Sequence, residues 1–531
     1  MKKHAVLKLL VLIVVLVRTI YYFAQPDLST DHLSQMAMAQ NFMAGHGFSF
    51  KYLDSGLKIF YSTHIQWPPF YPLLLALLSF ITTNTLFSSF IIQIAVLLSM
   101  VFIWKKIFNL FENLVSEQAY YYFITLLIIS TSVLNNINTV LVFSLLLLSL
   151  SLYFTFAFIF NNKSKKINLF LSSLFAALLF WTHYSYFFVA FYPAVVIFII
   201  FYRNKDKNNL YAAIGSFFIS LVVTSGVLIY NYLSTGFINY MDNPHLWDAG
   251  FFPQQLLLTD PFFINAFFNS SYFYSYILKT EHNVLLSVSL QIISFAILIT
   301  ICVLFLKLRK NKSLPFDKTS LLFVPFFVII ILTITFLLYF TLHYHEIPRP
   351  GWTHIGDPRY LSAVYLAVLA VIILLIFIKT DYLNKKILNL IKQIMLLLIF
   401  LSLSINIYIT AKEWGNYSFS ADNHLNFKED LQSLFDNIKL NSRVGKTPVF
   451  IDTDLTVRSF RISQYTGAAV ISTKEVSGIK EIPSNIVFFF IMPVQEQLRN
   501  EDKQLLVWSK KFNLTHAGQV YNNLLLYKVE N

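Results

Sequence analysis

The sequence contains a single cysteine, Cys302, among 531 residues. One thiol excludes an intrachain disulfide and a zinc site built on a C-x-x-C pair, and it gives no information on the redox compartment. Charge is scarce as well, because Asp, Glu, Lys and Arg make up 13% of the residues while 56% are hydrophobic. With a mean hydropathy of +0.61, the chain is too apolar for a soluble protein of this length and is predicted to be a polytopic membrane protein.

The net charge of +13 is unevenly distributed along the chain. Residues 411–531 carry 14 Lys and Arg against 13 Asp and Glu, so the remaining +12 lies before residue 411. Positive charge in the short loops of a membrane protein indicates topology rather than a nucleic-acid partner. We therefore expect no nucleic-acid ligand.

Apolar runs long enough to cross a bilayer predict about eleven transmembrane helices. They lie near 5–24, 86–104, 120–134, 140–160, 167–182, 184–202, 210–232, 285–307, 319–341, 359–378 and 387–410. With the N-terminus inside, the inner loops hold 19 Lys and Arg and the outer loops before residue 411 hold five. By the positive-inside rule, the long loops 25–85, 233–284 and 342–358 and everything after 410 are outside.

Two further regions interrupt this pattern. Residues 70–81 are apolar but too short to span, and prolines precede them, so we expect an interfacial or re-entrant helix. From residue 411 onward, short apolar runs such as "TPVFID" and "NIVFFFIM" alternate with helical patterns. We therefore predict a membrane domain over 1–410 and a small soluble α/β domain over 411–531, on the outer side and without a Gly-rich phosphate loop.

The outer loop between Pro26 and Pro72 is the richest in polar side chains that can carry out chemistry. Its "DHLSQMAMAQNFMAGHGFSF" followed by "WPPFYPLLLALL" resembles the first outer loop of the GT-C superfamily of membrane glycosyltransferases, which includes protein O-mannosyltransferases and aminoarabinose transferases of lipid A. The resemblance rests on the following positions: Asp31, Ala39, Gly45, Gly47, Pro68, Pro69, Tyr71 and Pro72. Weaker similarities are "WTHY" at 181–184, "YNYLSTG" at 230–236 and "DPRYL" at 357–361.

The resemblance implies an enzyme that takes a sugar from a polyprenyl phosphate in the bilayer and passes it to a lipid, glycan or protein acceptor at the outer face. It also implies an integral protein of the bacterial inner (plasma) membrane that acts in the cell envelope. Three positions depart from the pattern: Gln35 stands where Tyr is common, His32 follows Asp31 where many members carry a second acid, and "NNINT" at 135–139 lacks a carboxylate. The last departure argues against a metal-dependent mechanism, so no cofactor is expected, although a divalent metal is an open alternative.

Asp31 is the candidate general base. Partial dehydration near lipid disfavours the charged form of a carboxylate and makes it a better proton acceptor, which would give an inverting transfer. The alternative is that "STDHLSQM" caps a helix with Ser29, Thr30 or Asp31.

Arg359 is the candidate ligand of the donor phosphate, with Arg349, His183 and Arg18 in support. A guanidinium offers forked donors to phosphate oxygens, but an arginine at a helix end also snorkels or sets topology. The expected substrate-binding residues are His32, His64, Trp67, Tyr71 and Tyr360, although interfacial aromatic side chains usually anchor a protein in the membrane. The loop histidines fit no metal motif, so no metal ligand is assigned.

Two other functions compete with the transferase. A membrane transporter or lipid flippase should show internal repeats and charged or Gly/Pro-broken mid-membrane helices, and the sequence has no such repeat and almost no acids in its spans. A non-catalytic GT-C-like scaffold is the third reading, because of Gln35 and the acid missing from the second outer loop.

Overall fold

The computed structural model describes most of the helical part of the chain and the C-terminal strands. The described residues are 5–24, 30–54, 56–63, 65–129, 139–161, 164–238, 247–252, 299, 303, 316–346, 358–379, 385–413, 417–419, 425–427, 440–441, 444–452, 467–493, 500–519 and 524–530. Within some of the helices and strands, including the first turns of α2 (Thr30–Met43) and α15 (Pro358–Phe377), only the backbone is described.

The chain divides into two compact units. Unit 1 consists of Met1–Tyr21 and Gln93–Ile409, and unit 2 consists of Tyr22–Ile92 and Thr410–Asn531. The loop that follows the first helix therefore belongs to the same unit as the C-terminal residues. Helices α1 (Ala5–Ala24), α4 (Thr85–Leu110) and α16 (Lys385–Glu413) each include residues of both units.

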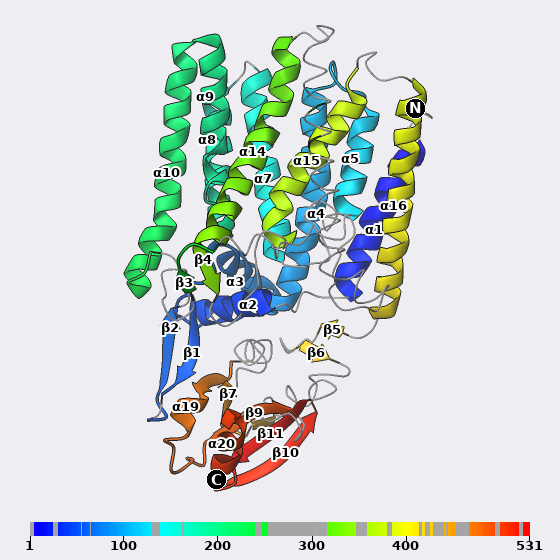
Figure 1. Ribbon diagram of the computed structural model, residues 1–531. Helices are drawn as coiled ribbons and strands as arrows, with labels where there is room; N and C mark the ends of the chain where they lie inside the picture. The colour runs from blue at the N-terminus through cyan, green and yellow to red at the C-terminus, as the bar shows by residue number, and fades with distance from the viewer. Residues whose placement is uncertain are drawn as a thin grey trace. The chain divides into compact units, whose positions relative to one another are not determined.

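Unit 1 is a bundle of helices (Figure 1). Besides parts of α1 and α4, its elements are α5 (Gln118–Ile129), α7 (Thr139–Phe160), α8 (Lys165–Phe180), the short 3-10 turns η2 (Tyr184–Tyr186) and η3 (Val189–Phe191), α9 (Tyr192–Asn204), α10 (Lys207–Thr235), the pair β3 (Trp247–Ala249) and β4 (Tyr344–Glu346), α14 (Phe316–His343), α15 and α16 (Lys385–Glu413). Aromatic and aliphatic side chains fill its interior, with Trp104, Phe111 and Phe156 among the largest fully buried ones.

The protein is an integral membrane protein. Among the described residues, six helices are long and apolar enough to cross a bilayer: Ala5–Tyr22, Thr85–Leu110, Phe143–Phe160, Lys207–Thr235, Ser320–His343 and Leu388–Tyr408. The expected spans 120–134, 167–182, 184–202 and 359–378 correspond to the shorter helices α5, α8, α9 and α15. Most of the expected span 285–307 lies outside the described residues.

The first loop folds into a helix, a hairpin and a second helix rather than an extended polar loop. Helix α2 ends at Met43, where Gly45 and Gly47 adopt positive φ values of 84° and 66°. Glycine reaches this left-handed region without the steric cost of a Cβ, so the chain turns sharply into β1 (Ser49–Leu53). Strand β2 (Ile59–Thr63) returns antiparallel to β1, and α3 (Phe70–Thr82) follows.

A polar corner separates α3 from the span that begins at Thr85. Helix α3 ends at Thr83, which has φ 57°, and Asn84 Oδ1 accepts from the backbone N–H of Phe87 at 2.9 Å. The hydroxyl of Ser88 bonds that of Ser79 at 2.9 Å. Because these groups satisfy the helix ends, α3 is a separate helix of 13 residues, about 20 Å long and too short to span.

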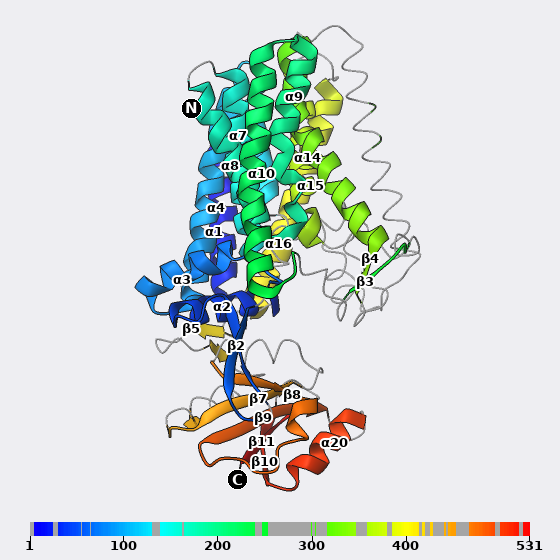
Figure 2. The same ribbon diagram turned by 90° about the vertical axis from the view of Figure 1, so that its left-hand side faces the viewer.

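The C-terminal residues and the first-loop hairpin share one seven-stranded mixed sheet (Figure 2). Its order is β10-β11-β9-β7-β8-β1-β2, where β7 is Thr447–Asp452, β8 Ala469–Ser472, β9 Ile486–Pro493, β10 Asn513–Gln519 and β11 Leu524–Glu530. Strand β7 runs parallel to both β8 and β9, whereas β11 pairs antiparallel with β9 and β10. Parallel neighbours need crossover connections, so this part of the chain has the α/β character that the sequence predicts.

The remaining elements of unit 2 are short. They are the pair β5 (Tyr417–Phe419) and β6 (Leu425–Phe427), and the helices α19 (Thr473–Val476) and α20 (Asn500–Ser509). Helix α20 packs on the sheet through Trp508, whose indole lies edge-on to Phe488 with ring centroids 5.7 Å apart. Trp508 Nε1 also donates to the Ile479 carbonyl at 3.0 Å. The expected helices at 427–439 and 454–465 lie almost wholly outside the described residues.

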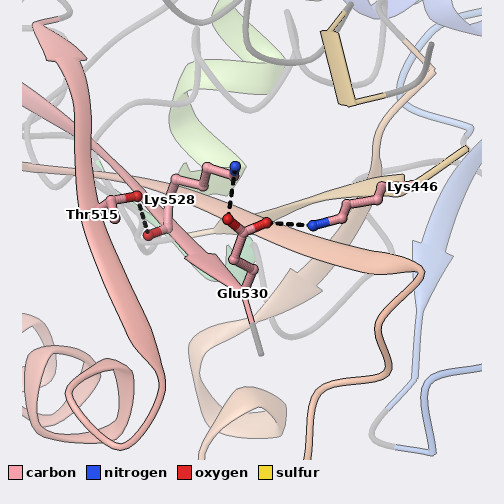
Figure 3. A network of polar contacts seen from close by, with 4 residues as sticks. All are labelled: Lys446, Thr515, Lys528 and Glu530. Carbon is pink, nitrogen blue, oxygen red and sulfur yellow. Dashed lines mark hydrogen bonds and ion pairs between the residues drawn. The ribbon is translucent and has the colours of Figure 1, made fainter. Parts of the chain in front are cut away.

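An ion-pair network ties the last strand to the start of β7 (Figure 3). Glu530 Oε2 accepts from Lys446 Nζ at 2.5 Å, and its Oε1 lies 3.0 Å from Lys528 Nζ. The hydrogen bond from Lys446 is the main cause that lowers the pKa of the Glu530 carboxyl. This carboxylate therefore helps to hold the end of the chain onto the sheet.

Candidate functional site

Three segments that are far apart in the sequence meet in unit 1. They are the "WTHY" region on the link from α8 to α9, the "YNYLSTG" region at the end of α10, and the start of α15 after "DPRYL". Asn231 Nδ2 donates to the Tyr184 hydroxyl at 2.9 Å. The Tyr186 and Ser362 hydroxyls are 2.8 Å apart. The fold thus joins the three weaker GT-C-like segments through two buried hydrogen bonds.

His183 begins the 3-10 turn η2. Its Nδ1 accepts from the backbone N–H of Ser185 at 3.2 Å and lies 2.8 Å from the Ser185 hydroxyl. The imidazole lies edge-on to the Tyr186 ring, with centroids 6.2 Å apart. Its orientation is therefore set locally through Nδ1.

The η2 turn is also tied to α7. Ser144 Oγ is 2.7 Å from Thr182 Oγ1, and the Ser144 hydroxyl bonds that of Tyr186 as well. Buried hydroxyls need partners because an unsatisfied polar group in an apolar interior is costly. This chain of hydroxyls explains why polar residues cluster in the middle of an apolar bundle.

Gly226 on α10 allows Trp181, at the start of the link from α8 to α9, to pack directly against that helix. A Cβ on Gly226 would lie 2.8 Å from Trp181 Cζ2, which is too close for any other residue type without a shift. Trp181 Nε1 donates to the Val223 carbonyl at 2.7 Å. The indole of Trp181 therefore lies directly against the α10 backbone and fixes residues 181–186 to that helix.

The predicted phosphate ligand Arg359 is the second residue of α15. It precedes Ser362 by three residues, and so lies about one helical turn from the contact with Tyr186. The side chains of Arg359 and Tyr360 are outside the described residues, as is Arg349. The backbone therefore brings the start of α15 to the η2 turn that carries His183.

Arg18 is a buried residue of α1 in a different part of unit 1. Its Nη1 donates to Asn406 Oδ1 on α16 at 2.9 Å, and its guanidinium lies 4.7 Å from the centre of the Tyr21 ring. Asn406 Nδ2 in turn donates to the carbonyls of Ser402 and Ile129. The described contacts of Arg18 join α1, α5 and α16 rather than the η2 turn.

The candidate base Asp31 is the second residue of α2, and its side chain is outside the described residues. Because α2 starts at Thr30, Asp31 lies in the first helical turn and Ser29, which is not described, precedes the helix. Gln35 stands one turn further on and is buried. Among the described contacts its Oε1 has no hydrogen-bond partner, so a polar group at this position turns toward the interior next to the candidate base.

The expected substrate-binding residues of the first loop are mostly buried in unit 2. His32 Nε2 and the Tyr71 hydroxyl are 3.5 Å apart, and both side chains are fully buried. Trp67 packs with Ala37, Met38 and Phe50. His64 lies outside the described residues. In this structure His32 and Tyr71 join α2 to α3, and Trp67 packs on α2 and β1.

Tyr186 and Ser362 were not expected from the sequence as residues of this region. Together with Asn231, which lies in the "YNYLSTG" segment, they supply the hydrogen bonds that join the segments. In the described part of the chain, no group of three or more His, Cys, Asp or Glu has the arrangement of a metal site.

Comparison with solved structures gives the architecture. No family model matches the sequence, and no curated protein matches it. ArnT from Cupriavidus metallidurans bound to undecaprenyl phosphate superposes with a TM-score of 0.56 at 8% identity, over 99% of this chain and 98% of that chain. The apo state of the same protein gives 0.52 at 11% identity, over the same shares of the two chains.

The chain has a GT-C-like fold. The match extends over 99% of the chain, so the GT-C-like fold includes residues of both units. At these identities the similarity is one of fold, and the roles of individual residues depend on the contacts described above.

Proposed function

We propose that the protein is a membrane glycosyltransferase that takes a sugar from a polyprenyl-phosphate donor. The observation that carries this proposal is the meeting of the His183 turn, the end of α10 and the first turn of α15 within a GT-C-like fold. The ArnT structure with this fold was bound to undecaprenyl phosphate, which supports a ligand of the same chemical class here.

Arg359 is the main ligand of the donor phosphate in this proposal, and His183 supports it. The phosphate gains negative charge when the sugar leaves, so a guanidinium stabilises the transition state more than the bound donor. Arg349 is assigned to the same phosphate by its position in the sequence, and Tyr360 is assigned to substrate binding. For Arg18 we retain a weaker role, because its described contacts hold α1 against α16.

Asp31 is the general base of the proposed transfer. The acceptor hydroxyl or amine attacks the anomeric carbon, the bond from that carbon to the phosphate oxygen breaks, and the acceptor proton moves to the Asp31 carboxylate. Attack from the side opposite the leaving phosphate inverts the anomeric centre. The polyprenyl phosphate leaves with the bonding electron pair, and no redox partner is required.

The orientation in the membrane follows from the distribution of charge. With Lys and Arg concentrated in the inner loops, we propose that the first loop and the C-terminal residues lie on the outer side of a bacterial plasma membrane. His32, Trp67 and Tyr71 are then supporting residues that hold α2 and its carboxylate, in keeping with their burial.

A transfer assay in membranes tests this function. Labelled polyprenyl-phosphate sugars are supplied with membrane vesicles that contain the wild type, Asp31→Asn or Arg359→Ala. We expect transfer by the wild type, a loss of roughly 100-fold or more for Asp31→Asn, and a loss of roughly 10- to 100-fold for Arg359→Ala. The proposal fails when the wild type transfers no sugar, and the assignment of the base fails when Asp31→Asn keeps full activity.

The same vesicles separate the transferase from a transporter. Labelled sugar or lipid that crosses the membrane unmodified, at an equal rate in the wild type and Asp31→Asn, would establish transport instead. The matched control is Gln66→Glu, which changes charge in the same loop at a residue outside the proposed machinery. It is expected to transfer sugar like the wild type.

A further inference from the structure

Tyr186 connects the two segments that carry His183 and Arg359. Its hydroxyl is buried and bonds Ser362 on α15, about one turn after Arg359, at 2.8 Å. Ser362 follows Tyr186 by 176 residues in the sequence. This hydrogen bond links the η2 turn directly to the N-terminal part of α15.

The other contacts of the η2 turn make it a firm support. Trp181 lies against Gly226, the Tyr184 hydroxyl accepts from Asn231, and Thr182 bonds Ser144. Two helices other than α15, namely α10 and α7, thus hold residues 181–186. On the α15 side, the hydrogen bond between Ser362 and Tyr186 joins that helix to residues 181–186.

We propose that Tyr186 is a positioning residue for the donor phosphate, acting through Ser362 on the turn that bears Arg359. This inference rests on the proposed function, because it takes Arg359 as the phosphate ligand. Tyr186 itself touches no substrate in this account. Its hydroxyl keeps the start of α15 in register with His183, so that Arg359 and His183 bind one phosphate without prior rearrangement of the helix.

A second buried tyrosine provides a matched control. The Tyr192 hydroxyl bonds the hydroxyls of Ser151 at 2.8 Å and Thr155 at 3.0 Å on α7, and that of Ser172 on α8. None of these partners lies on η2 or α15. Tyr192→Phe and Tyr186→Phe each remove one buried oxygen, so they should lower the thermal stability of the protein by comparable amounts.

The test measures direct binding of undecaprenyl phosphate to the purified full-length protein in detergent or nanodiscs. We expect Tyr186→Phe and Ser362→Ala each to raise Kd by about threefold to tenfold, the range for one lost buried hydrogen bond. Tyr192→Phe is expected to leave Kd unchanged. The wild type and all variants are first compared by thermal unfolding, and Ser362→Ala serves in place of Tyr186→Phe when the latter does not fold.

A double-mutant cycle distinguishes positioning from a general packing effect. In an Arg359→Ala background, Tyr186→Phe should weaken binding no further, because the residue that it positions is gone. Equal losses for Tyr186→Phe and Tyr192→Phe, or additive losses in the Arg359→Ala background, overturn the inference. When the wild type binds and Arg359→Ala weakens binding but Tyr186→Phe does not, only this inference fails, whereas absence of wild-type binding overturns the proposed function as well.

Discussion

The side-chain ammonium of Lys51 donates a hydrogen bond to the backbone carbonyl of Gly467, 3.0 Å away and 416 residues later in the sequence. Lys51 lies on β1, which pairs with β8 through Tyr52 and Val470. Burial lowers the pKa of the Lys51 ammonium, as expected for a cation held against a sheet rather than in water. The first loop is therefore an integral part of the sheet formed by the C-terminal residues.

We predict that Leu53→Ala destabilises unit 2. Leu53 is a hairpin residue, yet it is buried in the same cluster as Val449, Ile471 and Phe488. Truncating a fully buried leucine costs about 2–5 kcal/mol, and the measurement is thermal unfolding with limited proteolysis after residue 410. Ile59→Ala on the same hairpin is the control, because Ile59 is exposed and should change little. Equal effects of the two substitutions would show that the hairpin is not part of the core.

Glu530 predicts a dependence of stability on pH. Its folded-state pKa is lowered by Lys446 and Lys528, so its contribution is complete above the ordinary glutamate pKa and is lost as the pH falls through the lowered value. The melting temperature of the wild type should therefore fall below about pH 4.5, and part of that fall should be absent in Glu530→Gln. Glu481→Gln, at an exposed residue of the same unit, should keep the full wild-type pH dependence.

Helix α3 should lie at the membrane surface with one face in lipid. Leu77, Phe80 and Ile81 are 54%, 62% and 80% exposed and share one face of the helix, while Leu75, Ala76 and Ser79 are buried on the other. The single native cysteine makes spin labelling direct in a Cys302→Ser background. A spin label at Ile81→Cys should be relaxed more strongly by oxygen, which concentrates in the bilayer, than by a water-soluble nickel complex. The ratio of the two effects should indicate a shallow depth in the membrane.

Lys58→Cys, in the turn of the hairpin that precedes α3, is the reference for that labelling experiment. Its label is expected to favour the water-soluble relaxant. A label at position 81 with the same preference for water would exclude contact of α3 with lipid.

Substituting alanine for two glycines of α10 should change the stability of the protein in opposite directions. Gly226→Ala places a Cβ 2.8 Å from the Trp181 ring and should cost about 1–3 kcal/mol of stability through overpacking, with a loss of sugar transfer because residues 181–186 shift. At Gly215 nothing lies within 4 Å of an added Cβ, so Gly215→Ala should stabilise α10 by up to about 1 kcal/mol. Both variants are measured by thermal unfolding and by the transfer assay. Normal transfer activity in Gly226→Ala would show that the contact between Gly226 and Trp181 is not needed for function.

Transfer should persist after metal removal. The segment "NNINT" at 135–139 offers no carboxylate to a divalent cation, and carboxylates are the ligands that Mg²⁺ and Mn²⁺ prefer. We expect membranes treated with EDTA, then washed, to keep the wild-type rate within about twofold. Loss of activity that returns on addition of Mg²⁺ or Mn²⁺, and not of Na⁺, would contradict the metal-independent mechanism.

Long apolar runs determined the membrane helices directly from the sequence. Helices α1, α10 and α14 begin and end within three residues of the predicted spans, and α4 begins within one residue of its span but extends six residues further. Hydropathy along one segment is enough to place a helix in lipid. Strands β7 and β9 were predicted for a similar local reason, since each is a short apolar run. Strand β10 was not, because its sequence "NLTHAGQ" is largely polar and it lies at the edge of the sheet.

Short sequence motifs were also enough to indicate the GT-C-like resemblance and the candidate catalytic and binding residues. Only the tertiary structure decided which of these groups meet. The contact of Tyr186 with Ser362, the pairing of β1 with β8 and the burial of His32 against Tyr71 all join segments that local patterns treat separately. The physical reason is that hydropathy is a property of a segment in its solvent, whereas a hydrogen bond between distant residues depends on how the whole chain packs.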